Sequence, residues 1–128
     1  MTRLVLDSGG LTALARRRED TAAIVAVFKR DDLWPPLVPS IVLVESLSGR
    51  AHTDVRLNRL LKTCDIVEEL PERLARRAGQ LRALARTGSA VDAVVVTMAE
   101  PGGAVLSSDL KDLRSLASHA QDVTVHRP

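Results

Sequence analysis

The chain has 128 residues, of which 45% are hydrophobic, so it can bury one core and fits a single domain over residues 1–128. No apolar run reaches the roughly 18 residues of a membrane span, and an acid at position 7 comes too early for a signal-peptide core, so we expect a cytoplasmic protein. The single cysteine, Cys64, excludes a disulfide framework and a cysteine-based metal site. The sequence assigns no role to Cys64, His52, His119 or His126.

Strand and helix signals alternate along the whole chain. The first half predicts, in order, a strand over Arg3–Leu6, helices over Leu11–Arg18 and Thr21–Lys29, a strand at Leu37-Val38, and a helix between Ser40 and Ser48. The second half predicts a helix over Val55–Leu61, a strand at Ile66-Val67, helices from Pro71 to about Arg86 and from Ser89 through Met98, a strand over Ala104–Leu106, a helix over Leu110–Ala117, and an edge strand over Val123–Val125. Such alternation favours an α/β fold with a mostly parallel sheet covered by helices on both faces.

The segment Ile41–Leu47 places an acid in an apolar helix. Four aliphatic residues run directly into Glu45, and at helical pitch Leu43 and Leu47 share a face with Val44 beside them. A segment that is apolar nearly all round predicts a buried helix, where a carboxylate costs several kcal/mol unless a cation or strong donors meet it. That cation is a metal ion in one interpretation; in the other, Glu45 reaches solvent or pairs with an arginine.

The helix that begins at Pro71 has two distinct faces. Its inner face consists of Leu74, Ala78, Leu81 and Ala85, and its outer face carries Arg73, Arg76, Arg77, Arg82 and Arg86. The arginines form either a solvated face or a surface that contacts phosphates or a partner. For such contact Arg73, Arg76 and Arg77 are the candidates.

Four further acids occupy positions from which they could meet Glu45. Asp7 and Asp109 each follow a short apolar strand, and the carboxyl ends of parallel strands open on the same edge of a sheet. Asp112 lies one helical turn beyond Asp109, so the two can face one point. Two alternatives stay open, because Asp7 could simply cap a helix and Asp92 forms a Ser-x-x-Asp capping pattern with Ser89.

Crowded carboxylates keep their charge at neutral pH only around cations, and oxygen-only ligands suit Mg²⁺ or Mn²⁺ rather than Zn²⁺. A site of this kind suits metal-assisted hydrolysis of a phosphodiester. If the five acids share one site, the rest of the chain carries 18 basic residues against 11 acidic ones, a balance of +7. A basic body around an acidic hole suits a polyanionic substrate.

The motifs together resemble a known family. They are Leu4-Val-Leu-Asp7-Ser8, Val44-Glu45-Ser46, Val91-Asp92-Ala93 and Ser107-Ser108-Asp109-Leu-Lys-Asp112-Leu113. In this order and spacing they resemble the PIN-domain ribonucleases, and within them the VapC-type toxins of toxin–antitoxin pairs. The resemblance implies a PIN-like (Rossmann-like) three-layer sandwich with a central, mostly parallel sheet. It also implies a Mg²⁺- or Mn²⁺-dependent endoribonuclease, a homodimer, a cognate VapB-like antitoxin, and a structured RNA such as tRNA or rRNA as substrate.

By the same resemblance, the catalytic, metal-binding acids are Asp7, Glu45, Asp92 and Asp109, with Asp112 as a weaker ligand and Ser8 and Ser107 in support. The chain departs from the family at Gly9-Gly10, which we expect to loosen the first helix, and at Leu113, where an aromatic residue is frequent. No motif acid is missing, so we expect an active enzyme. Two alternatives are an inert PIN-like module that binds RNA or protein, and a phosphoacceptor signalling domain, whose paired acids after the first strand are absent here.

Overall fold

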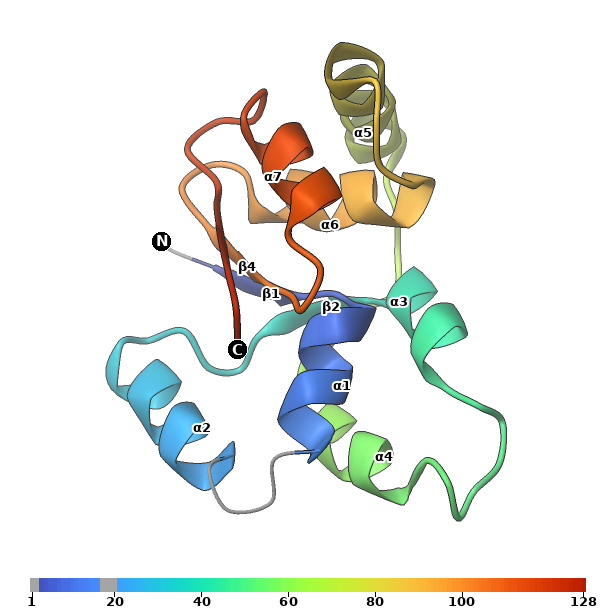
Figure 1. Ribbon diagram of the computed structural model, residues 1–128, viewed down its shortest axis with the longest axis vertical. Helices are drawn as coiled ribbons and strands as arrows, with labels where there is room; N and C mark the ends of the chain where they lie inside the picture. The colour runs from blue at the N-terminus through green and yellow to red at the C-terminus, as the bar shows by residue number, and fades with distance from the viewer. Residues whose placement is uncertain (1–2, 17–20) are drawn as a thin grey trace.

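Five short parallel strands form one sheet at the centre of the protein (Figure 1). The computed structural model describes residues 3–16 and 21–128. The strands are β1 (Leu4–Leu6), β2 (Leu37–Pro39), β3 (Asp65–Val67), β4 (Ala104–Leu106) and β5 (Thr124–His126), in the spatial order β3-β2-β1-β4-β5. Because every neighbouring pair is parallel, the carboxyl ends of β1 and β4 lie at the same edge.

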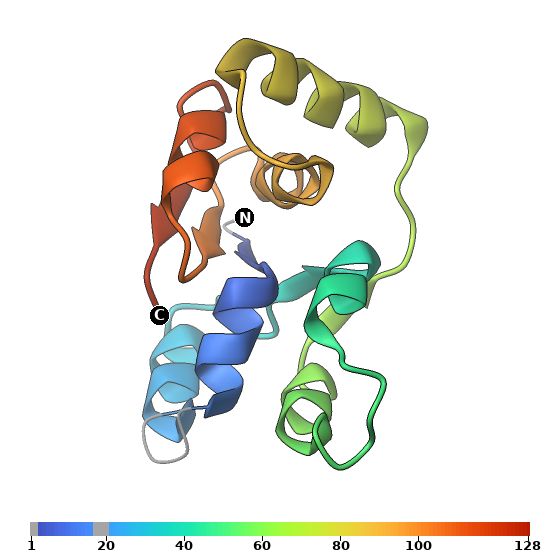
Figure 2. The same cartoon turned by 45° about the vertical axis from the view of Figure 1, so that its right-hand side comes forward.

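Helices cover both faces of this sheet. In chain order they are α1 (Ser8–Arg16), α2 (Thr21–Arg30), α3 (Ser40–Ser46), α4 (Val55–Leu61), α5 (Glu72–Ala85), α6 (Ala90–Ala99) and α7 (Lys111–Ala117). Figures 1 and 2 show α5, α6 and α7 on one side of the sheet and α1, α2 and α4 on the other. The predicted three-layer α/β sandwich is therefore confirmed.

The helix α6 is the centre of the larger layer. At helical pitch the sequence predicts one buried stripe along it, formed by Val91, Val94, Val95 and Met98, yet every residue from Ala93 to Ala99 is buried. The cause is its position, because α6 packs on β1, β2 and β4 from one side and on α5 and α7 from the other. From Ala93 onward the helix has no solvated face, whereas its first turn, which carries Asp92, is only partly covered.

Two predicted elements differ from the structure. The helix α1 begins at Ser8, so Gly9 and Gly10 belong to its first turn, and its predicted end at Arg18 lies outside the described residues. The helix α3 was expected to be buried on all sides, and this prediction is wrong. Only Val42 is buried in it, whereas Ile41 and Val44 are 42% and 74% exposed. The reason is that α3 is short and packs mainly on β2 and α1, which cover one of its faces.

Across the described ranges, none of the helices has the length and apolar composition needed to span a bilayer.

Candidate active site

A cleft of about 400 Å³ opens at the carboxyl ends of β1 and β4. It brings together all five of the acids that the sequence singles out, namely Asp7, Glu45, Asp92, Asp109 and Asp112. The remaining lining residues are Ser8, Gly9, Ser89, Ser108 and Leu113. No lysine or arginine is among the described residues that line the cleft, so its walls carry only negative formal charge.

Asp7 is the buried member of this set, with 6% of its surface exposed. Its Oδ2 accepts a 2.5 Å hydrogen bond from the Ser107 hydroxyl, and its Oδ1 accepts a 2.8 Å bond from the Gly10 amide. Burial raises the pKa of Asp7, the two hydrogen bonds oppose the rise, and the charges of Asp92 and Asp109 add to it. Asp7 therefore does cap α1, as one interpretation proposed, and it also faces the cleft.

The glycine pair after Asp7 permits a close approach of α1 to β4. A Cβ atom at Gly10 would lie 2.1 Å from the carbonyl oxygen of Leu106, and one at Gly9 would lie 2.5 Å from the hydroxyl of Ser108. At Gly10 the nearest atom is backbone, so any other residue type would require a backbone shift, whereas at Gly9 the nearest atom belongs to a side chain. The glycines therefore allow the first helix to pack directly against the end of β4, just before Ser107, and the expectation that they loosen this helix stays a prediction.

Glu45 reaches the cleft from α3. The sequence predicts a buried carboxylate here, but Glu45 is exposed, because α3 turns one side to solvent. Burial therefore does not force a counter-ion onto Glu45. Its placement is nevertheless as expected, since it lines the same cleft as Asp7, Asp92 and Asp109.

Asp92 and Asp112 are each held by a hydroxyl-bearing neighbour. Asp92 and Ser89 form a complete capping box, in which the Ser89 amide donates to Oδ2 of Asp92 at 3.1 Å and the Asp92 amide donates to the Ser89 hydroxyl at 3.0 Å. The Thr87 hydroxyl donates a 2.6 Å bond to Oδ1 of Asp112. The capping interpretation of Asp92 is thus correct for the helix, and the same side chain also lines the cleft.

The donor set fits a hard divalent cation in its chemistry. In the described part of the chain, no three acidic, histidine or cysteine side chains are arranged to hold an ion as they stand. Mg²⁺ does not need three, because it keeps several water molecules and is usually bound by one or two carboxylates together with substrate phosphates. Asp7, flanked by the charges of Asp92 and Asp109, meets that requirement with oxygen ligands only.

The arginines predicted to contact RNA or a partner lie outside the cleft. The Arg77 guanidinium binds Glu100 through two hydrogen bonds of 2.9 and 2.7 Å, which joins α5 to the end of α6. Arg76 pairs with Glu72 on the exposed face of α5. Contact of Arg73, Arg76 and Arg77 with RNA or a partner stays a prediction.

Sequence reasoning did not identify two residues at this site. Ser108 lines the cleft, and its position between Ser107 and Asp109 in the last motif could have pointed to it. Thr87, which holds Asp112, gave no such signal, because it lies 25 residues away in the sequence and the tertiary structure brings the two together.

Comparison with known proteins establishes the fold. No family model and no curated protein matches the sequence. A chain of VapBC2 from Rickettsia felis, whose crystal structure has a DNA fragment from their promoter bound, matches with a TM-score of 0.72 and 13% identity over 99% of both chains. The protein PAE2754 from Pyrobaculum aerophilum matches with a TM-score of 0.64 and 17% identity over 97% of this chain and 90% of its own. At these identities the likeness shows the fold alone, so the motif-based resemblance is confirmed at that level: the chain has a PIN-like fold over nearly its whole length.

Proposed function

We propose that this chain is a Mg²⁺- or Mn²⁺-dependent endoribonuclease and the toxin of a toxin–antitoxin pair. The observation that carries the proposal is the cleft in which five carboxylates from four separate segments meet without a basic residue among the described lining. Carboxylates so placed repel one another, and a divalent cation relieves that repulsion. The PIN-like fold, shared with a chain of VapBC2, supports the same assignment.

Asp7, Asp92, Asp109 and Glu45 are the proposed catalytic residues, with Asp112 as a weaker contributor. When bound, the ion would lower the pKa of a water molecule and offset charge on the scissile phosphate. The chain's own part is to hold its acids in place and to donate hydrogen bonds to them. Hydrogen bonds from Ser107 and Gly10 favour the charged form of Asp7, and the capping box orients Asp92.

The partners follow from the fold likeness and stay part of the proposal. They are a VapB-like antitoxin, a second copy of the chain in a homodimer, and a structured RNA such as tRNA or rRNA. The VapBC2 match supports the antitoxin.

The test compares RNA cleavage by the purified protein in Mg²⁺ and in EDTA. We expect cleavage only with the metal, and a loss of roughly a hundredfold or more in rate for Asp7→Asn and Glu45→Gln, since each removes a charge that binds the ion. Glu69→Gln is the matched control, because Glu69 is exposed and lies outside the cleft. Unchanged cleavage by Asp7→Asn would show that the catalytic assignment is wrong. Binding of RNA without product in either condition would favour an inert module.

A further inference from the structure

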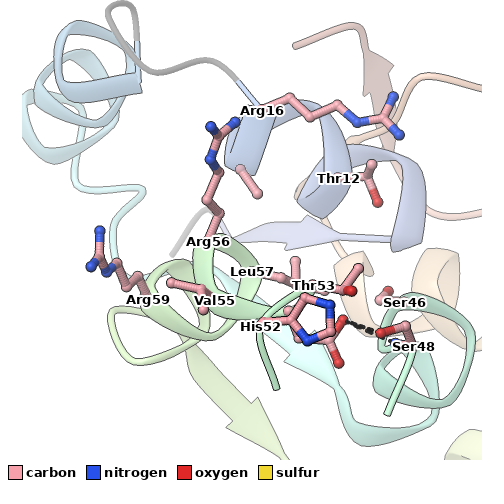
Figure 3. Close-up of a pocket in the computed structure, with 12 residues that line it drawn as sticks. Thr12, Arg16, Ser46, Ser48, His52, Thr53, Val55, Arg56, Leu57 and Arg59 are labelled. Atoms are coloured by element: carbon pink, nitrogen blue, oxygen red, sulfur yellow. Dashed lines mark hydrogen bonds between the residues drawn. The ribbon is translucent and has the colours of Figure 1, made fainter. Parts of the chain in front are cut away.

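A second cavity, of about 700 Å³, lies beside the acidic cleft between α1, α3 and α4 (Figure 3). Arg16 lines it from the end of α1, and Arg56 and Arg59 line it from α4. In Figure 3, the side chain of Arg56 extends from α4 toward α1 across this space. We call the cavity the basic groove, defined by these three arginines together with Thr12 and Ser46.

The basic groove and the acidic cleft share two walls. On α1, Ser8 lines the cleft, and Thr12, about one helical turn or 5.4 Å farther along the same face, lines the groove. On α3, Glu45 lines the cleft, and the next residue, Ser46, lines the groove. The cleft and the groove are therefore adjacent along α1 and α3.

The charge of the groove is opposite to that of the cleft. Asp54 is the acid in the groove lining, and its carboxylate accepts hydrogen bonds from the Ser48 amide at 3.0 Å, the Ser48 hydroxyl at 2.8 Å and the Gly49 amide at 3.1 Å. These hydrogen bonds, of which that from the Ser48 amide has the largest effect, lower the pKa of Asp54. The Asp54 carboxylate thus has its hydrogen-bond partners in the loop before α4.

The three arginines of the groove, Arg16, Arg56 and Arg59, in contrast, have no acidic partner among the described ion pairs. Guanidinium groups bind phosphate oxygens through paired N–H donors, so arginines beside an acidic cleft suit a ligand that carries several phosphates. Neither Phe28 nor Trp34 is in the lining, so its aromatic residue among those described is His52.

We infer that the basic groove binds the sugar–phosphate backbone of the RNA strand next to the phosphate held in the acidic cleft. The inference rests on the proposed function, since it takes the cleft as the cleavage site. Arg56 and Arg16 are positioning residues, which hold the strand so that one phosphate reaches Asp7 and its neighbours. Because phosphate contacts carry no sequence information, the groove adds affinity for any RNA strand of sufficient length.

The test measures binding of a short labelled single-stranded RNA by fluorescence anisotropy in EDTA, where metal-dependent cleavage does not occur. We expect Arg56→Gln to weaken binding by about fivefold at low ionic strength. It should also reduce the slope of log affinity against log salt concentration by about 0.7, the value for one single-strand phosphate contact. Arg59→Gln is the second variant, in case Arg56→Gln does not fold. Arg30→Gln is the matched control, since Arg30 is an exposed arginine at the end of α2 that lines neither cavity.

Each outcome separates the groove from the cleft. Weaker binding by the groove variants, with no cleavage in Mg²⁺ by the unaltered protein, would support the groove and overturn the proposed nuclease. Binding of Arg56→Gln and Arg59→Gln equal to that of Arg30→Gln, or no binding by the unaltered protein, would overturn the groove whether or not the protein cleaves RNA. Loss of a VapB-like protein partner by these variants, with RNA binding intact, would make the groove a protein-docking site and also overturn the inference.

Discussion

The hydroxyl of Ser107, at the end of β4, donates a 2.5 Å hydrogen bond to Oδ2 of Asp7, at the end of β1. The two residues are 100 positions apart in the sequence, and the parallel pairing of β1 with β4 brings them together. The same hydroxyl oxygen accepts a 3.1 Å hydrogen bond from the backbone amide of Asp109. One buried serine thus fixes the relative positions of two acids of the cleft.

Removal of this hydroxyl should change the titration of the site. Ser107→Ala deletes a hydrogen bond that lowers the pKa of Asp7, so that pKa, already raised by burial, should rise further. We expect RNA cleavage to fall by about tenfold at neutral pH. The acid limb of the pH–rate profile should move to higher pH, which a cleavage assay over a series of buffers would measure.

Ser118→Ala is the control for this change, because the Ser118 hydroxyl is exposed and donates to the carbonyl of Ser115 on the far part of α7. A pH–rate profile of Ser107→Ala that superimposes on that of Ser118→Ala would contradict the assigned role of Ser107.

The raised pKa of Asp7 also predicts how stability depends on pH. The pKa of Asp7 in the folded state lies above its ordinary value of 3.8. The stabilisation that this carboxyl contributes is therefore complete below pH 3.8, where it is protonated, and is lost as the pH rises through the folded-state pKa. Asn stays neutral throughout, so the melting temperature of Asp7→Asn should increase relative to that of the unaltered protein as pH rises. Thermal unfolding from acid to neutral pH measures the difference.

The same variant tests the metal. Mg²⁺ binds the ionised carboxylate, so at neutral pH a saturating concentration should raise the melting temperature of the unaltered protein by about 5 °C. Asp7→Asn should gain much less. An equal gain in both proteins would mean that the ion binds elsewhere.

The close contact at Gly10 predicts a large effect of a single methyl group. Gly10→Ala would place a Cβ atom 2.1 Å from the carbonyl oxygen of Leu106. Because this contact involves the backbone of both segments, relieving it would require a shift of α1 or of β4. We expect a loss of about 3 kcal/mol in the free energy of unfolding. The displacement of α1 should also weaken the hydrogen bond from the Gly10 amide to Asp7.

Gly79→Ala is the matched control, since a Cβ atom there has nothing within 4 Å and Gly79 lies inside α5. Ala is the better helix former, so this variant should be more stable by about 0.5–1 kcal/mol. Urea denaturation of both variants measures their free energies of unfolding. Equal changes in the two variants would contradict the close packing of α1 on β4.

The ion pair between Arg77 and Glu100 should contribute to stability in a pH-dependent way. Arg77 lowers the pKa of Glu100, and the Gln121 amide also donates to its carboxylate at 2.8 Å. Glu100→Gln should lower the free energy of unfolding by about 2 kcal/mol at neutral pH, because it weakens charged hydrogen bonds in a half-buried position. A depressed pKa stabilises the fold above its ordinary value of 4.5, so the difference should vanish as pH falls through the folded-state pKa.

The comparison for this pair is Glu72→Gln, which removes the partner of Arg76 at a site where both side chains are about 80% exposed. Its effect should stay below about 0.5 kcal/mol, because exposed pairs within a helix contribute little. If the two variants lost similar stability in chemical denaturation, the half-buried pair of Arg77 and Glu100 would contribute no more than an exposed one.

The sequence by itself determined the order of the elements and the identity of the acids in the cleft. Apolar runs followed at once by Asp7 or Asp109 predicted strands that end in a carboxylate, and parallel pairing places such ends at one edge. The Ser89–Asp92 capping pattern likewise forms as predicted. These features depend on near neighbours in the chain, whose spacing is visible in the sequence.

Only the tertiary structure decided how each acid is surrounded. Glu45 is exposed because its helix packs on one side, and Asp7 is buried because β4 and α1 enclose it. The hydrogen bonds from Ser107 and Thr87, and the basic groove beside the cleft, also join residues far apart in the chain. Burial and hydrogen bonding depend on which distant segments pack together, and no local period in the sequence records that packing.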